Sequence, residues 1–255
     1  MAFIHAVGAS AGPHRTQSLA VVDIDIHFVG GGWHHERWEV ADIGVLVTFR
    51  RLNEVLRRKV VLLQSKRLYP REAEFQEAHG LARPGGFGYF VRPKETWGEQ
   101  TRLFRFDSDC RYRALQIGDS QWAAIQEYEA RYGIPVHYCF YHPGSIPFQV
   151  TVPIQWPLDA AEPAAVATRV MSATIVRAST TEFARNYAPS LADLAEGADA
   201  PGVRLPSFIA DQVLACNEGY VPTGDFLTDA GVNRIFNQRT GPISSAIAID
   251  IELPE

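Results

Sequence analysis

Residues 40–47 read VADIGVLV and residues 61–67 read VLLQSKR, and these two stretches decide the fold. The first is a mostly apolar run rich in β-branched residues, and the second follows the apolar residues of KVVLL at 59–63, which is typical of buried strands. Alternate residues of a strand point to the same face, so Gln64 and Lys66 share one face of their strand. When the two strands pair, Asp42 of the first strand converges with Gln64 and Lys66 on one patch.

A further strand is expected before this pair. Residues 21–28, VVDIDIHF, alternate between apolar and polar side chains, as a half-buried strand does. The glycines at 30–32 can adopt positive φ and so turn the chain. With strands expected over 36–49 and 59–68 and a polar turn over 50–58, the sequence predicts an antiparallel meander.

The next segment predicts a helix followed by a strand. Residues 119–133 read DSQWAAIQEYEARYG, in which Asp119 or Ser120 can cap the first turn and Gly133 can end the last. Residues 134–141, IPVHYCFY, form a dense apolar strand. The order strand, strand, strand, helix, strand indicates an α/β core.

The C-terminal part is richer in alanine and is expected to be mainly helical. Helices are predicted over residues 161–173, 181–194, 207–217 and 224–237, and a last strand over 245–253. We therefore divide the chain into a core over 1–155 and a mainly helical accessory region over 156–255. This region either folds separately or packs on the core as one domain, with its last strand returning to the first sheet.

Composition restricts the function classes. The chain has 255 residues, 46% hydrophobic and 21% charged, and a net charge of -5, which disfavours nucleic-acid binding by bulk positive charge. It holds no apolar run of the roughly 18 residues that cross a bilayer, and no basic segment ahead of an apolar one as in a signal peptide. Its three cysteines lie far apart, which is typical of reduced thiols. We expect a cytoplasmic protein without a membrane partner.

The patch of Asp42, Gln64 and Lys66 suggests metal chemistry. A carboxylate and an amide oxygen are hard ligands that suit Mg²⁺, which keeps several of its waters. A neighbouring lysine can orient or deprotonate a water and can stabilise negative charge that develops on phosphorus.

On these two motifs the sequence resembles the PD-(D/E)xK nuclease superfamily, in the QxK variant of Mrr-like restriction endonucleases. The resemblance covers about residues 21–141 and implies a restriction-endonuclease-like mixed sheet flanked by helices. It also implies hydrolysis of DNA phosphodiester bonds with Mg²⁺ or Mn²⁺. Asp42 is then the metal-binding acid, Gln64 a metal ligand that replaces the usual second acid, and Lys66 the catalytic lysine.

The resemblance further implies partners. Such nuclease subunits work as homo-oligomers or beside a targeting or helicase protein, in bacterial restriction or antiviral defence. The low basicity of this chain fits a subunit that relies on a partner for part of its DNA contacts.

The family pattern includes a further acid on a helix before the first strand, and here Gln17 stands near that place. Glu36 lies too far along the strand from Asp42, and Glu39 points to the opposite face. In a hairpin turned at the glycines, Asp23 or Asp25 would come within about 8 Å of Asp42 and could hold the metal.

Basic residues follow the same strands and are candidates for contacts with DNA phosphates. The candidates are Arg50, Arg51, Arg58 and Arg67.

Two other interpretations stay open. In the first, the site has lost its acids and the chain is an inactive nuclease-fold scaffold that binds a protein or nucleic acid. In the second, the chain is an unrelated α/β protein that binds a small molecule, with the aromatic-rich residues 89–97 lining the pocket.

Overall fold

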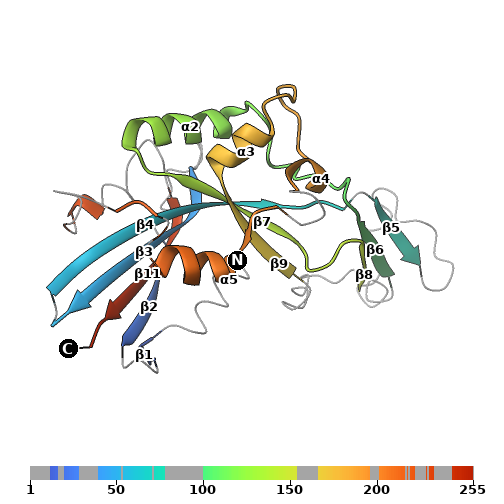
Figure 1. Ribbon diagram of the computed structural model, residues 1–255. Helices are drawn as coiled ribbons and strands as arrows, with labels where there is room; N and C mark the ends of the chain where they lie inside the picture. The colour runs from blue at the N-terminus through green and yellow to red at the C-terminus, as the bar shows by residue number, and fades with distance from the viewer. Residues whose placement is uncertain are drawn as a thin grey trace.

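The computed structural model describes about two thirds of the chain. The described residues are 12–16, 20–28, 40–52, 54–70, 72–77, 100–153, 166–195, 201–215, 217, 219–221, 228, 230–232 and 243–254. Their strands form an eight-stranded mixed sheet, in the order β1-β2-β11-β3-β4-β7-β9-β10, and a separate three-stranded sheet, in the order β5-β6-β8. The chain is therefore a mixed α/β fold that is rich in strands (Figure 1).

The element bounds are as follows. The large sheet holds β1 (His14–Arg15), β2 (Val21–Phe28), β3 (Ala41–Arg51), β4 (Glu54–Arg67), β7 (Val136–Pro143), β9 (Val166–Ser172), β10 (Val203–Arg204) and β11 (Ile243–Glu252). The small sheet holds β5 (Glu72–Glu77), β6 (Gln100–Phe106) and β8 (Phe148–Pro153). The helices are α2 (Ser120–Tyr132), α3 (Ala173–Ser179), α4 (Leu191–Leu194), α5 (Leu205–Ser207) and the π-helix η6 (Phe208–Leu214).

The hairpin of β3 and β4 lies at the centre of the sheet, and the predicted antiparallel pairing is confirmed. Ile43 lies opposite Leu63 and Gly44 lies opposite Leu62. Both strands run further than predicted, so residues 50–58 are mostly strand and the chain reverses at Leu52, whose φ is 52°. The longer strands carry the hairpin well beyond the buried part of the sheet.

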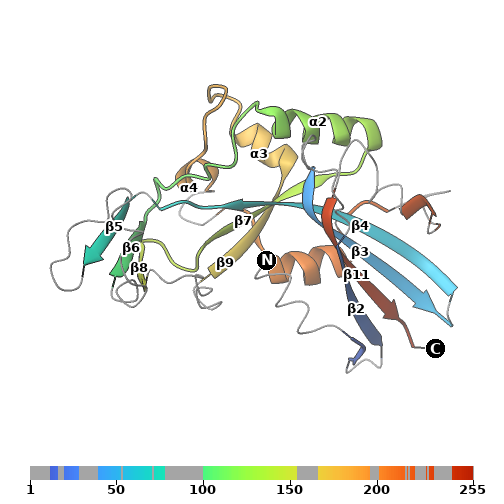
Figure 2. The ribbon, with the colours of Figure 1, turned by 180° about the vertical axis from the view of Figure 1, so that it is seen from behind.

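The predicted meander is wrong at its first step, because β11 lies between β2 and β3 (Figures 1 and 2). Ile247 of β11 lies opposite Ile26 of β2 in an antiparallel pair and opposite Val45 of β3 in a parallel pair. Apolar residues stand on both faces of β11, as in AIAI at 246–249, and a strand that is apolar on both faces suits the interior of a sheet. Of the two alternatives left open for the C-terminal region, the structure shows the one in which the last strand returns to the first sheet.

The described C-terminal residues are less helical than predicted. Residues 166–172 form strand β9 where a helix was expected over 161–173, because VATRV is rich in β-branched residues. Within the expected helix 181–194, only α4 is helical. Strands β9, β10 and β11 join the sheet that contains β3 and β4, so residues on both sides of position 155 build one sheet.

Helices cover both faces of the large sheet (Figure 1). The predicted helix over 119–133 is confirmed as α2, in which Asp119 Oδ1 accepts from the backbone N–H of Trp122 at 2.7 Å and Gly133 ends the helix at φ 65°. Ile125 of α2 packs with Leu62, whereas Phe208 of η6 packs with residues of the opposite face. Gln64 and Lys66 share the face of Leu62 and so point to the α2 side.

Two observations complete the fold. The stretch expected to be rich in loops, 69–117, contributes strands β5 and β6 of the small sheet. Among the described residues, no helix combines the length and apolar character needed to cross a membrane.

Candidate active site

Asp42 and Gln64 meet across the central hairpin. The register of β3 and β4 places them opposite one another, and Gln64 Nε2 donates to Asp42 Oδ2 at 2.9 Å. The backbone N–H of Ser65 donates to the same oxygen at 2.6 Å. Ser245 of β11 donates from its hydroxyl to the backbone carbonyl of Asp42 at 2.9 Å. The carboxylate is thus held by β4, and its backbone is held by β11.

The other end of the Gln64 amide is buried without a partner. The Gln64 side chain is 3% exposed, and its Oε1 accepts no hydrogen bond from any residue that the structure describes. Because Nε2 donates to the carboxylate, the orientation of the amide is fixed by this bond. A buried oxygen left without a donor costs about 1–3 kcal/mol. An unpaired hard oxygen beside a carboxylate is what a hard cation binds.

Lys66 lies on the same face as Gln64, under the start of α2. Its side chain is 3% exposed, and Nζ donates to the carbonyl of Ala114 at 2.8 Å and to Oε1 of Gln121. Burial lowers the pKa of Lys66, while the charges of Asp42 and Asp119 act in the opposite direction. The structure therefore brings together all three residues that the two motifs predicted.

Sequence reasoning missed the groups that position Lys66. The carbonyl of Ala114 comes from the segment before α2, and Gln121 stands in the first turn of α2. The helix was predicted, but its place over β4 depends on packing between Ile125, Tyr128 and the sheet. A glutamine in the first turn carries no signal of its own in a sequence.

The fit to a divalent metal rests on two oxygen donors. They are the Asp42 carboxylate and Gln64 Oε1, a small set that suits Mg²⁺, which keeps several waters. Within the described residues, no group of three His, Cys, Asp or Glu side chains gathers at metal-binding distance. Gln17, Glu36 and Glu39, which were considered for a further acid, lie outside the described residues.

Asp23 and Asp25 do not join the site. Asp25 lies opposite Ala248 of β11, which lies opposite Leu46, four residues beyond Asp42 on β3. Four residues along a strand and two strand spacings place Asp25 about 16 Å from Asp42. Asp23 is two residues further away. The prediction of a metal ligand among them is wrong because β11 replaces the expected hairpin partner.

The four arginines do not form one exposed strip. Arg58 is 6% exposed, which contradicts its prediction as a phosphate contact, whereas Arg50 is partly exposed and pairs with Asp250 at 3.1 Å. Arg51 is exposed near the hairpin turn, whereas Arg67 is exposed beside Lys66. Nine residues of β4 separate Arg58 from Arg67, about 30 Å along the strand. Only Arg67 lies next to the candidate site.

Lys66 makes the stability of the protein dependent on pH. Its pKa in the folded state lies below the ordinary value of 10.5, so the unfolded chain binds more protons than the folded one between these two values. We expect the wild type to gain free energy of unfolding, relative to Lys66→Met, as pH rises toward 10.5. Urea unfolding of both proteins across this range measures the difference.

The matched control is Arg67→Met, which removes an exposed basic side chain from the same strand. Its difference from the wild type should stay constant with pH. A constant difference for Lys66→Met as well would contradict the prediction.

Comparisons with known proteins gave no relative: no family model, no curated protein and no solved structure matches this chain. The site is therefore interpreted from its own geometry.

Proposed function

We propose that this protein is a metal-dependent nuclease that hydrolyses DNA phosphodiester bonds, as an effector subunit in bacterial restriction or antiviral defence. The observation that carries the proposal is the buried Gln64 Oε1, unpaired among the described residues and held beside the Asp42 carboxylate. A buried oxygen in this position is explained by a cation that the protein binds there.

The arrangement of elements supports a restriction-endonuclease-like core. The acid stands on β3 and the Gln64–Lys66 pair on β4, the antiparallel partner of β3. Helix α2 then crosses to β7, which runs parallel to β4, with Leu62 opposite Val136. This is the order that the resemblance to PD-(D/E)xK nucleases implies.

Each residue of the site has a role in this proposal. Asp42 and Gln64 would hold Mg²⁺ or Mn²⁺, which supplies charge stabilisation and a more acidic bound water. Lys66 has three N–H groups, two of which donate to Ala114 and Gln121. In this proposal, the third would donate to the substrate phosphate or the attacking water. Burial increases the strength of this interaction because the local dielectric is low.

A second candidate is a scaffold of the same fold without turnover. Two observations favour it. The described part of the chain offers a metal only two oxygen donors, and Lys66 already donates to two acceptors of the protein itself. Such a scaffold would bind a protein partner or nucleic acid. Titration calorimetry with Mn²⁺ separates the two candidates, because a scaffold has no metal binding that disappears in Asp42→Ala.

The test of the nuclease proposal is cleavage of supercoiled and linear DNA. We expect cleavage with Mg²⁺ or Mn²⁺ and none after chelation by EDTA, with activity restored when excess metal is returned. Cleavage that continues in EDTA contradicts a metal-dependent mechanism. If no DNA is cut under any of these conditions, and calorimetry detects no metal binding that depends on Asp42, the scaffold replaces the nuclease.

A further inference from the structure

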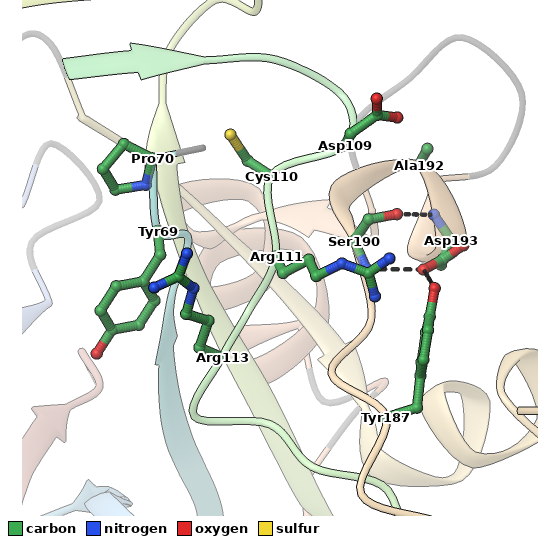
Figure 3. A pocket seen from close by; sticks show the side chains of 10 residues that line it. All are labelled: Tyr69, Pro70, Asp109, Cys110, Arg111, Arg113, Tyr187, Ser190, Ala192 and Asp193. Carbon is green, nitrogen blue, oxygen red and sulfur yellow. Dashed lines mark hydrogen bonds between the residues drawn. The ribbon is translucent and has the colours of Figure 1, made fainter. Parts of the chain in front are cut away.

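A pocket of about 460 Å³ is lined by residues that directly follow β4, by the segment before α2 and by residues around α4 (Figure 3). Two tyrosines and two arginines face it from three segments of the chain: Tyr69, Arg111, Arg113 and Tyr187. A volume of this size lies within the range of pockets that take small organic ligands. Aromatic rings and guanidinium groups are the side chains that stack on nucleic-acid bases and bind phosphates.

Two stretches of backbone connect the pocket to Lys66: the residues that follow Lys66 along the chain, and the segment that holds Arg111 and Ala114. Tyr69 follows Lys66 by three residues, about 10 Å of extended chain. The backbone N–H of Tyr69 donates to the carbonyl of Arg111 at 3.0 Å, and Lys66 donates to the carbonyl of Ala114 in the same segment. One short segment therefore forms a wall of the pocket and also positions the candidate catalytic lysine.

Cations already lie against both tyrosine rings. The guanidinium of Arg67 lies 4.6 Å from the centre of the Tyr69 ring, and that of Arg113 lies 5.7 Å from it. Arg111 lies 4.6 Å from the centre of the Tyr187 ring and donates to the carbonyl of Ala188 at 2.7 Å. The three arginines are exposed, so their charges are accessible to a ligand.

Two carboxylates also line the pocket, and one of them is part of its wall. Asp193 Oδ2 accepts from the Tyr187 hydroxyl and from the backbone N–H of Ser190, both at 2.8 Å (Figure 3). These bonds fix the Tyr187 ring and the start of α4. The second carboxylate, Asp109, lies in the segment that precedes Arg111. The basic side of the pocket is therefore the side of Tyr69, against whose ring Arg67 and Arg113 lie.

We infer that this pocket receives an unpaired nucleotide of the substrate strand, with its base on the Tyr69 side of the pocket and its phosphate at Arg67 and Arg113. The inference rests on the proposed nuclease function. A bare phosphate would not require two aromatic rings, and a base in a duplex is stacked on its neighbours and cannot enter a pocket. The substrate is therefore a single strand, or a duplex with a frayed or displaced nucleotide near the cleaved bond.

The test measures binding of a fluorescent oligothymidylate by anisotropy in EDTA, where cleavage does not interfere. We expect Tyr69→Ala to weaken binding about tenfold, within the range measured for loss of one base–aromatic contact. Arg113→Gln, an exposed substitution that keeps the fold, should weaken binding and make it less sensitive to salt. The control is Arg57→Gln, an exposed arginine toward the distant end of the hairpin, which should bind like the wild type.

The inference is overturned if both pocket variants bind the oligonucleotide like the wild type, or if a duplex of equal length binds as tightly as the single strand. Competition by thymidine monophosphate at the same concentration as the oligonucleotide would also overturn it, because the pocket would then serve a free nucleotide. Metal-dependent cleavage, together with unchanged oligonucleotide binding by both pocket variants, would support the nuclease function and refute the nucleotide pocket. Oligonucleotide binding that depends on Tyr69, without any cleavage of DNA, would support the pocket and refute the nuclease function.

Discussion

Lys66→Met is expected to lose about 10² to 10³-fold in the rate of DNA cleavage, the cost of removing one charge-stabilising donor from an active site. Methionine keeps the length and apolar stem of lysine, and the site under α2 is buried, so the variant should fold. The rate is measured with saturating Mg²⁺, and retention of the fold by circular dichroism and thermal unfolding.

Lys59 provides a control of the same kind on the opposite face of β4. It is a fully buried lysine whose Nζ donates to the carbonyl of Val213 at 2.8 Å, near the end of η6. Lys59→Met removes the same charge from the same strand, and should reduce stability while leaving cleavage close to that of the wild type. Equal activity losses in the two variants would contradict a specific role for Lys66.

The parts of the fold that follow from local sequence were predictable. The apolar runs around Asp42 and Gln64 predicted the two strands, and the cap at Asp119 with Gly133 predicted the bounds of α2 to within a residue. These features depend on neighbours within a few positions, and the side-chain period of a strand then determines which residues share a face.

The parts that failed depend on contacts between distant residues. Nothing near residues 21–28 signals that β11, more than 200 residues later, takes the place beside β3. Because β11 lies between β2 and β3, Asp23 and Asp25 lie too far from Asp42 to join the site. Arg58 is a different case: residues 50–58 are polar enough for a turn, yet Arg58 pairs with Thr48 within the β3–β4 hairpin and is 6% exposed.

The contacts of the candidate site also fall into two groups, those that local sequence predicts and those that depend on distant packing. Asp42 and Gln64 are brought together by pairing of two consecutive strands, which a sequence indicates well. Gln121 reaches Lys66 only because α2 packs over β4, and the orphaned Gln64 Oε1 depends on which groups surround it in three dimensions. Sequence therefore predicted which residues meet, whereas their burial and their hydrogen-bond partners depend on packing in three dimensions.

Gln64→Glu should have opposite effects with and without metal. The substitution replaces the donor that lies 2.9 Å from Asp42 Oδ2 by a second carboxylate at a position that is 3% exposed. Without metal at neutral pH, we expect the free energy of unfolding to fall by about 3–5 kcal/mol, the cost of an uncompensated buried charge. Urea unfolding of the metal-free proteins measures this loss.

The pH dependence follows from the same repulsion. Two carboxylates this close cannot both ionise freely, so the pair retains a proton and its apparent pKa rises above the unfolded value of about 4.3. A carboxyl with a raised pKa destabilises the fold increasingly as pH rises from the unfolded value to the folded one. The difference between wild type and variant should therefore be small in acid and should grow toward neutral pH.

Metal should reverse the loss. A cation between Asp42 and the carboxylate introduced at position 64 neutralises the repulsion and gains a charged ligand, so Mg²⁺ or Mn²⁺ should raise the stability of Gln64→Glu more than that of the wild type. Gln64→Met, which lacks both oxygen and donor, is the control and should gain nothing from metal. If Gln64→Glu is as stable as the wild type without metal, or does not respond to either cation, then Asp42 and position 64 do not form a cation site. The nuclease proposal would then lose its main support.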